Sequence, residues 1–186
     1  IPLNLEMAAT DEMLEIALKH LPAAVCLVPE NREERTTEGG LDVDRNFERL
    51  TPFAEELGAA GIRLSLFVEP DQVQLEAAKA LGAPVVELHT GTYCNTQLGS
   101  IERDKTLAKI VEASAHAERL GLECHAGHGL GFETVGPIAA IPSIVELNIG
   151  HFLIGEAIFG GLEITISQMR ALLDNSRADI IDDCSP

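Results

Sequence analysis

Four short segments of the sequence alternate apolar and polar residues, and this pattern restricts the fold more than any other feature. The segments read LNLEM at 3–7, VELHT at 86–90, LECHA at 122–126 and VELNI at 145–149. Alternation with a period of two is typical of β-strands, which place successive side chains on opposite faces. Each segment therefore predicts a strand with one apolar face and one polar face.

Helical patterns separate the predicted strands, so the chain reads as a repeated strand–helix unit. Strands are expected at 2–7, 24–28, 63–69, 84–90, 122–126 and 144–149. Helices are expected after an N-cap at Thr10, after an N-cap at Thr51 with Pro52 as the first helical residue, from Pro70, from Ser100 to Gly121, and over about 162–173. Because strands that alternate with helices pair in parallel, we expect a parallel sheet.

The polar faces of these strands favour a closed barrel over an open sheet. Strands of an open parallel sheet with helices on both faces are apolar nearly throughout. The alternation instead predicts a barrel whose apolar side chains face the helices and whose polar side chains face a wet, functional interior. The residues predicted to face inward are Asn4, Glu6, Glu87, His89, Glu123, His125, Glu146 and Asn148. A structural polar network inside the barrel is the alternative interpretation.

A TIM (β/α)8 barrel has eight strand–helix units, and we count six in this α/β sequence. We expect a single partial barrel domain over residues 1–186, with two units preceding Ile1, because the chain lacks an initiator Met and opens directly into a strand. Barrel enzymes place their sites at the C-terminal ends of the strands. The candidate functional residues at those ends are Glu6, Glu30, Glu69, His89, His128 and His151.

The segment CHAGHGLG, residues 124–131, allows three interpretations of its two histidines. A metal site at His125 and His128 would need a third ligand from elsewhere, and ligands three residues apart suit a helix better than a strand end. Proton transfer by His128 is the favoured interpretation, because a histidine titrates near neutral pH and can serve as acid or base. A purely structural His128 is the third possibility.

Glycine-rich turns after the last two predicted strands favour a substrate that carries phosphate. They lie at 127–131 and 150–155, where barrels frequently bind phosphate through backbone N–H groups. The long connection 30–43 adds hydroxyl and guanidinium groups suited to a phosphorylated sugar, at Arg32, Arg35, Thr36 and Thr37. All four lysines fall inside helical patterns, which argues against an aldolase that uses a lysine Schiff base.

Composition argues against several kinds of partner and location. Thirty acidic residues against thirteen basic ones give a formal charge of −17, which disfavours nucleic acid and anionic membranes as partners. The longest apolar stretches are short and broken by prolines, so no transmembrane helix is expected. Four cysteines without C-x-x-C spacing are typical of reduced thiols, and we expect a cytoplasmic protein.

Several motifs resemble the pyridoxine 5′-phosphate synthase family, in order and over nearly the whole chain. They are LNLEMA, LVPE followed by TTEGGLDV, VELHTG, AGHGL, and IAAIP followed by IVELNIGH. The resemblance implies a TIM-barrel enzyme that forms a homo-octamer and needs no metal or organic cofactor. It also implies a reaction in vitamin B6 biosynthesis: 1-deoxy-D-xylulose 5-phosphate condenses with 3-amino-2-oxopropyl phosphate, and inorganic phosphate and water are released.

The resemblance implies roles for individual residues. By position, Glu6 matches the family's catalytic general base and His128 its general acid. Thr36 matches a contact to the deoxyxylulose phosphate, and the matches to contacts with the amino-oxopropyl phosphate are Gly129, Gly150 and His151. The family's first two strand units, which carry a further catalytic histidine, have no match here. We therefore expect little or no activity from residues 1–186 alone.

Two alternative functions remain open at this point. The first is another phosphate-binding barrel enzyme, an isomerase or epimerase that uses Glu6 and His128 as an acid–base pair. The second is an inactive barrel fragment that serves only in binding or assembly.

Overall fold

The structure is a computed structural model that describes residues 1–30 and 39–182 and contains one six-stranded parallel sheet. The strands are β1 Asn4–Ala8, β2 Ala24–Val28, β3 Arg63–Val68, β4 Val85–His89, β5 Glu123–Gly127 and β6 Ile144–Asn148. Each strand pairs in parallel with the next strand along the chain. The six predicted strands and their parallel pairing are therefore confirmed.

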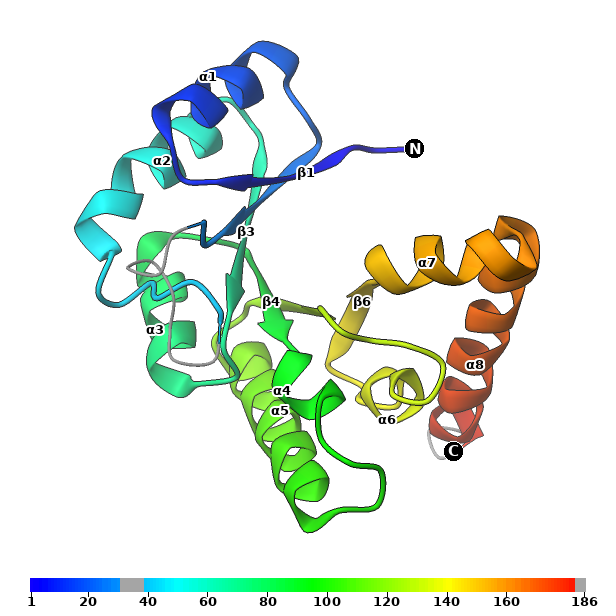
Figure 1. Ribbon diagram of the computed structural model, residues 1–186. Helices are drawn as coiled ribbons and strands as arrows, with labels where there is room; N and C mark the ends of the chain where they lie inside the picture. Colours follow the sequence, from blue (N-terminus) through cyan, green and yellow to red (C-terminus); the bar gives the residue numbers. More distant parts are fainter. Residues whose placement is uncertain (31–38, 183–186) are drawn as a thin grey trace.

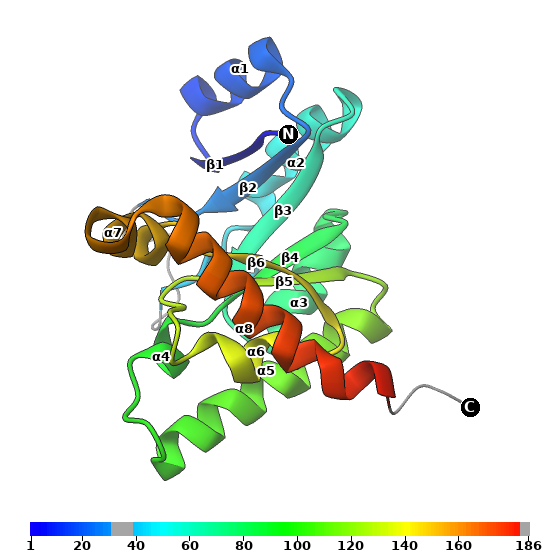
Figure 2. The ribbon, with the colours of Figure 1, turned by 90° about the vertical axis from the view of Figure 1, so that its right-hand side faces the viewer.

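Helices connect the strands and pack on one side of the sheet (Figures 1 and 2). Their bounds are α1 Asp11–His20, α2 Phe47–Ala59, α3 Gln72–Leu81, α4 Gly91–Cys94, α5 Ile101–Arg119, α6 Val135–Ala139, α7 His151–Gly160 and α8 Leu162–Asp182. Helices α2 and α3 contact β3, α5 contacts β4 and β5, and α6 contacts β6. The helices thus cover the outer face and leave the inner face to the polar side chains.

The strand order of the sheet is the order of the strands in the sequence. In a doubly wound sheet the strand order changes direction at one point, whereas in a barrel each strand lies next to the strand that follows it in the sequence. The order is therefore compatible with a TIM barrel. Among the described residues, β1 pairs only with β2 and β6 only with β5, so the sheet has two open edges.

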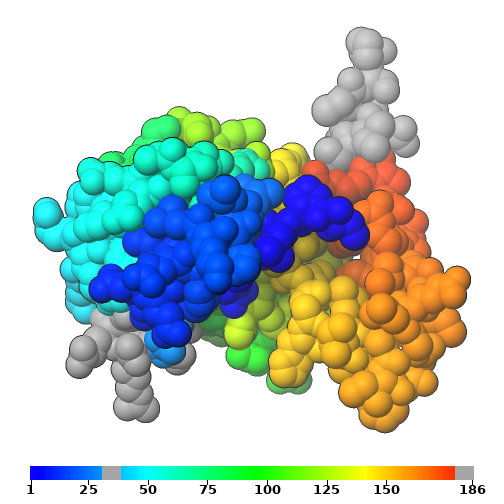
Figure 3. Space-filling view, turned by 90° about the horizontal axis from the view of Figure 1, so that it is seen from above, coloured from blue at the N-terminus to red at the C-terminus, as the bar shows by residue number. Residues whose placement is uncertain are grey.

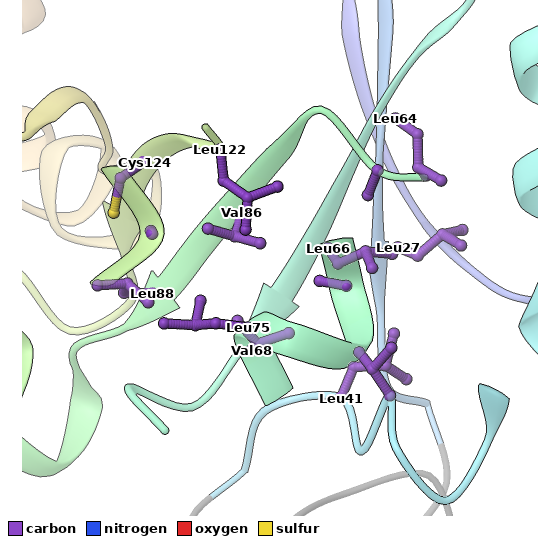
Figure 4. Packing of buried hydrophobic residues seen from close by; sticks show 14 of the residues in the cluster. Leu27, Leu41, Leu64, Leu66, Val68, Leu75, Val86, Leu88, Leu122 and Cys124 are labelled. Atoms are coloured by element: carbon purple, nitrogen blue, oxygen red, sulfur yellow. The ribbon is translucent and has the colours of Figure 1, made fainter. Parts of the chain in front are cut away.

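The hydrophobic core lies between the sheet and the helices. It contains fully buried side chains from the outer faces of neighbouring strands, including Leu27, Leu66, Val86 and Leu88. Figure 4 shows these side chains with Leu75 of α3, at the centre of the cluster. Each fully buried side chain of this size contributes about 1.5–3 kcal/mol, so this layer supplies the main stabilisation of the fold.

Two predicted helix N-caps are confirmed by their hydrogen bonds. The Oγ1 atom of Thr10 accepts from the backbone N–H of Met13 at 3.3 Å. The Oγ atom of Ser100 accepts from the backbone N–H of Arg103 at 3.1 Å. Each cap satisfies a donor that the first helical turn leaves without an intrahelical partner, and contributes about 1 kcal/mol.

Two predicted helix starts are wrong. Helix α2 begins at Phe47, so Thr51 and Pro52 lie inside it, and the Thr51 hydroxyl donates to the Phe47 carbonyl oxygen at 2.9 Å. Helix α3 begins at Gln72, where the Asp71 side chain caps the Val73 N–H group at 2.8 Å. In α2 the burial of apolar residues on both sides of Pro52 outweighs the hydrogen bond that proline cannot donate.

The C-terminal part of the chain contains more helix than the sequence patterns predict. Helices α4, α6 and α7 were not predicted, and α8 extends to Asp182 rather than ending near residue 173. Helix α7 has no buried residue, and Ile158 and Phe159 are 77% and 88% exposed. In the space-filling view α7 (orange) stands at the periphery, across the molecule from α2 (cyan) (Figure 3).

Among the described residues, no helix combines the length and apolarity needed to cross a bilayer.

Replacing Pro52 with alanine should stabilise the protein. The substitution restores a backbone donor to the sixth position of α2, and Pro52 is exposed, so little packing is lost. We expect the free energy of unfolding to rise by about 1–3 kcal/mol in urea denaturation. A matched control, Glu55→Ala on the exposed surface of the same helix, should change it by less than about 0.5 kcal/mol. An unchanged or lower stability of P52A would show that α2 is bent to accommodate the proline.

Candidate active site

A pocket lies at the C-terminal ends of the strands and contains most of the predicted site residues. Glu6, His89, His128, Gly129, Gly150 and His151 all line it. Glu69 and Glu30 are not among the lining residues, and Glu69 contacts the lining residue His89. Thr36, Arg32, Arg35 and Thr37 lie outside the described residues. The structure thus brings Glu6 and His128 to the same end of the sheet, as the strand directions require.

Glu6 lies on β1 and faces the polar side of the sheet. Its register partner on the neighbouring strand is Cys26, whose side chain is buried on the same side. Glu6 itself is exposed, because β1 forms an open edge among the described residues. Its carboxylate is therefore accessible from the pocket.

His128 is the first residue after β5 and adopts a left-handed backbone conformation, with φ of 77°. The hydroxyl of Thr90 lies 2.7 Å from the His128 carbonyl oxygen and 2.8 Å from the Gly127 carbonyl oxygen. Non-glycine residues rarely adopt this conformation, which persists only where neighbouring groups hold it. Thr90 of the adjacent chain segment supplies that restraint.

Burial and nearby positive charge lower the pKa of the His128 imidazole. Burial is the largest cause, and His89 and His151 lower the pKa further, while the carboxylate of Glu6 acts in the opposite direction. The lowered pKa makes the imidazolium form a stronger acid. A larger share of His128 is therefore neutral at a given pH than of an ordinary histidine.

Glu87, on β4, is a buried carboxyl group at the centre of the inner face. The Nδ2 group of Asn148 donates to its Oε2 atom at 2.8 Å, and the Cys26 thiol lies 3.8 Å from the same oxygen. Burial raises the pKa of Glu87 to about 7, with a further upward contribution from Glu6. A Cβ atom at Gly127 would overlap the Glu87 carboxyl group, so this position requires glycine.

The sequence analysis placed Glu87 on the inner face but gave it no role at the site. The signal that could have identified it is a single carboxylate between two valines and a leucine in VVELH. Its neighbour Asn148 was also predicted to face inward, and both residues line the pocket. A carboxyl group that titrates near pH 7 in a pocket is a candidate for proton transfer.

His125 is buried but does not line the pocket. Its Nε2 atom lies 2.8 Å from Glu123 Oε1, and its Nδ1 atom lies 3.4 Å from Glu146 Oε1. Glu123 also pairs with Arg63 at 2.6 Å, close to the N-terminal ends of the strands. His125 thus belongs to an ion-pair layer below the pocket and does not share a site with His128. No group of three metal-ligating side chains occurs in the described part of the chain.

The N-terminus of α7 lies at the edge of the pocket. Gly150 is the N-cap of this ten-residue helix and His151 its first residue, and both line the pocket with Phe152. The first backbone N–H groups of a helix and its dipole attract anions such as phosphate. Gly129, with φ of 81°, lines the same pocket from the turn after β5. The predicted phosphate-binding turn at 150–155 is therefore a helix start.

Comparison with known proteins assigns the chain to a family. Residues 1–175 match the model of the family described as "Pyridoxal phosphate biosynthesis protein PdxJ". Among curated relatives, "Pyridoxine 5'-phosphate synthase" of Rhodospirillum rubrum is 63% identical over 94% of this chain and 70% of that protein. The protein of the same name from Zymomonas mobilis is 60% identical over 96% of this chain and 69% of that protein.

Solved structures with low sequence identity share the fold. The HpcH/Hpal aldolase/citrate lyase family protein from Burkholderia cenocepacia superimposes with a TM-score of 0.58, at 14% identity over 94% of this chain and 77% of that chain. The xylose isomerase domain protein from Planctomyces limnophilus gives a TM-score of 0.55, at 16% identity over 80% of this chain and 62% of that chain. At these identities the likeness concerns the fold alone.

The raised pKa of Glu87 makes a prediction about stability. A carboxyl group with an ordinary pKa of 4.5 and a folded-state pKa of about 7 is protonated in both states below pH 4.5 and has no net effect there. Between pH 4.5 and 7 the unfolded chain loses this proton while the folded protein keeps it, so the native state is progressively destabilised, and the effect is complete above pH 7. Each pKa unit corresponds to about 1.4 kcal/mol, so the full effect is on the order of 3 kcal/mol.

We therefore expect the variant Glu87→Gln to match the wild type in unfolding free energy near pH 4.5 and to exceed it at pH 8. Urea denaturation at a series of pH values measures the difference. The same substitution at exposed Glu55 is the control, and it should give a difference that does not grow with pH. A constant difference for E87Q between pH 4.5 and 8 would contradict a folded-state pKa near 7.

Proposed function

The chain belongs to the PdxJ family of pyridoxal phosphate biosynthesis proteins, and from this we propose that its pocket is the active site of a pyridoxine 5′-phosphate synthase. The observation that carries the assignment is 63% identity to a curated enzyme of that name over 94% of the chain. The isomerase or epimerase alternative is not favoured, because the curated relatives described above, at 60% and 63% identity, both carry the synthase name. The roles of Glu6 and His128 are those that the resemblance implies, and their shared position in one pocket supports them.

The proposed substrates are 1-deoxy-D-xylulose 5-phosphate and 3-amino-2-oxopropyl phosphate. The pocket has a volume of about 1110 Å³, which is large enough for two small phosphorylated molecules together. The N-terminus of α7, with Gly150 and His151, suits one phosphate, and Gly129 lies beside it. The role of Thr36 in holding the deoxyxylulose phosphate remains a prediction from the resemblance.

The proposed mechanism is acid–base catalysis by side chains in different environments. Glu6, exposed on the edge strand, acts as general base. His128, whose pKa is lowered by burial and by His89, acts as general acid. Condensation, dehydration, loss of phosphate and ring closure each move protons at different atoms, so several donors and acceptors are needed. Glu87, whose pKa is about 7, is suited to assist these transfers.

We also propose that the six strand–helix units belong to a TIM (β/α)8 barrel. The two remaining strands would lie between β6 and β1, the open edges of the described sheet. Apolar side chains at these edges support the proposal, since Leu3 and Val145 are 58% and 63% exposed. Further strands would cover them and would enclose the polar inner face.

The resemblance further implies a cytoplasmic homo-octamer, which we include in the proposal. Exposed apolar side chains on α7, among them Ile158 and Phe159, support burial of this helix in an assembly. The described cysteines, Cys26, Cys94 and Cys124, are free thiols, which fits a reducing compartment.

Incubation of the full-length protein with both substrates should yield pyridoxine 5′-phosphate and inorganic phosphate in equal amounts. Glu6→Gln and His128→Asn should each lower kcat by a factor of about 10² to 10⁴, because each removes a group that transfers protons. Chromatography of the product and a phosphate assay measure the two yields. Glu55→Gln, on the exposed face of α2, is the control and should retain wild-type kcat. Undiminished turnover in both site variants would refute the assigned roles.

A further inference from the structure

A carboxylate–histidine pair lies beside His128, and the mechanism proposed above does not use it. The Nδ1 atom of His89, at the end of β4, is 3.0 Å from Oε1 of Glu69, which follows β3. Both side chains are about 8% exposed, so solvent screens their interaction weakly. A carboxylate and an imidazole buried together at the edge of an active-site pocket indicate a functional arrangement.

The hydrogen bonds of the Glu69 carboxylate indicate how the nitrogen atoms of the His89 ring are used. The N–H group of Gly40 donates to Oε1 of Glu69 at 2.7 Å, which marks this oxygen as an acceptor. A Cβ atom at Gly40 would lie 2.5 Å from the Glu69 nitrogen, so the close approach requires glycine. With an acceptor opposite Nδ1, His89 donates from Nδ1 to Glu69, in the neutral ring and in the imidazolium form alike.

The His89 ring packs against the His128 ring. Their centroids are 5.0 Å apart, and Phe67 contacts both rings, at 5.2 Å from His89 and 6.1 Å from His128. A Cβ atom at Gly91 would lie 2.6 Å from His89 Nε2 and 3.0 Å from His128 Cδ2, so the chain after β4 also closes on both rings. His89 therefore forms one wall of the space that the His128 side chain occupies.

Consecutive residues of β4 and its following turn thus restrain two parts of His128. Thr90 holds the backbone carbonyl in the left-handed conformation, and His89 limits the orientation of the imidazole. We infer that Glu69 is a positioning residue of the active site, which fixes the tautomer and orientation of His89 so that His89 keeps the His128 imidazole directed into the pocket. The inference rests on the function proposed above for His128.

The groups that face His128 determine how its titration responds to a change at His89. They are Glu6 of β1, His89 of β4, His151 of α7 and the Cys94 thiol of α4, which lies 3.8 Å from the His128 carbonyl oxygen. His89 and His151 disfavour the imidazolium form of His128, whereas Glu6 favours it. Removing His89 should therefore raise the pKa of His128, because both the burial of the His128 ring and the charge of His89 act to lower it.

The kinetic test uses Glu69→Gln, His89→Gln and the double variant in the full-length protein. We expect each single variant to lower kcat by about 10-fold or more with a smaller change in KM, since misorientation of a catalytic group affects turnover more than binding. The double variant should be no slower than H89Q, because Glu69 affects His128 only through its contact with His89. Asp71→Asn, two residues from Glu69, is the matched control and should retain kcat, because asparagine also caps α3.

A titration of the histidines by NMR tests the inference without requiring turnover. In the wild type, ¹⁵N shifts should show His89 protonated on Nδ1, and H89Q should move the His128 titration midpoint to higher pH while D71N leaves it in place. An Nε2-protonated His89, an unmoved His128 midpoint, or E69Q turnover within two-fold of wild type would each overturn the inference. Absence of product from the wild type together with the expected NMR results would instead refute the proposed function and leave the positioning geometry supported.

Discussion

The polar inner face of the parallel sheet is the constraint on which the rest of the structure depends. Burial of a carboxylate without a partner costs several kcal/mol, so a sheet with this face needs partners for each buried group. The partners come from the same strand, from a strand two places away in the sheet, or from the turn after a neighbouring strand. Glu123 and His125 pair near the N-terminal ends, Glu87 accepts from Asn148 at mid-height, and Glu69 meets His89 near the C-terminal ends.

The layers formed by these pairs differ in what they can do. The lower layer joins Arg63, Glu123, His125 and Glu146 into a chain of ion pairs that links β3, β5 and β6. The middle layer contains a carboxyl group whose pKa of about 7 lets it exchange a proton at neutral pH. The upper layer opens into the pocket beside the helix N-terminus of α7. Structural support and proton transfer are thus separated along the strands.

Much of this arrangement could be predicted from the sequence because it follows from strand geometry. Alternation in LNLEM and VELHT determines which side chains face inward, and parallel strands bring Glu6 and His128 to the same end. Helix α7 could not be predicted in the same way, because HFLIGEAIFG is apolar on all sides and has no amphipathic period. The start of α2 was missed because core burial on either side of Pro52 overrides the local preference of proline.

The pairing of Glu69 with His89 shows a further limit of sequence patterns. Both residues were placed at strand ends, but their contact depends on the register of β3 against β4 and on the close approach of Gly40. Strand register and loop approach arise from packing across the whole sheet, which no local pattern specifies.

Proton transfer in several steps requires groups that remain in different protonation states at one pH. In this pocket burial sets Glu87 apart, since it lies between Cys26 of β2 and Asn148 of β6. A buried carboxyl group with a pKa of about 7 can hold a proton near neutral pH and act as an acid there. The Glu6 charge also raises the pKa of Glu87, so the alternating strands that build the wall also place a carboxylate that helps Glu87 to keep its proton.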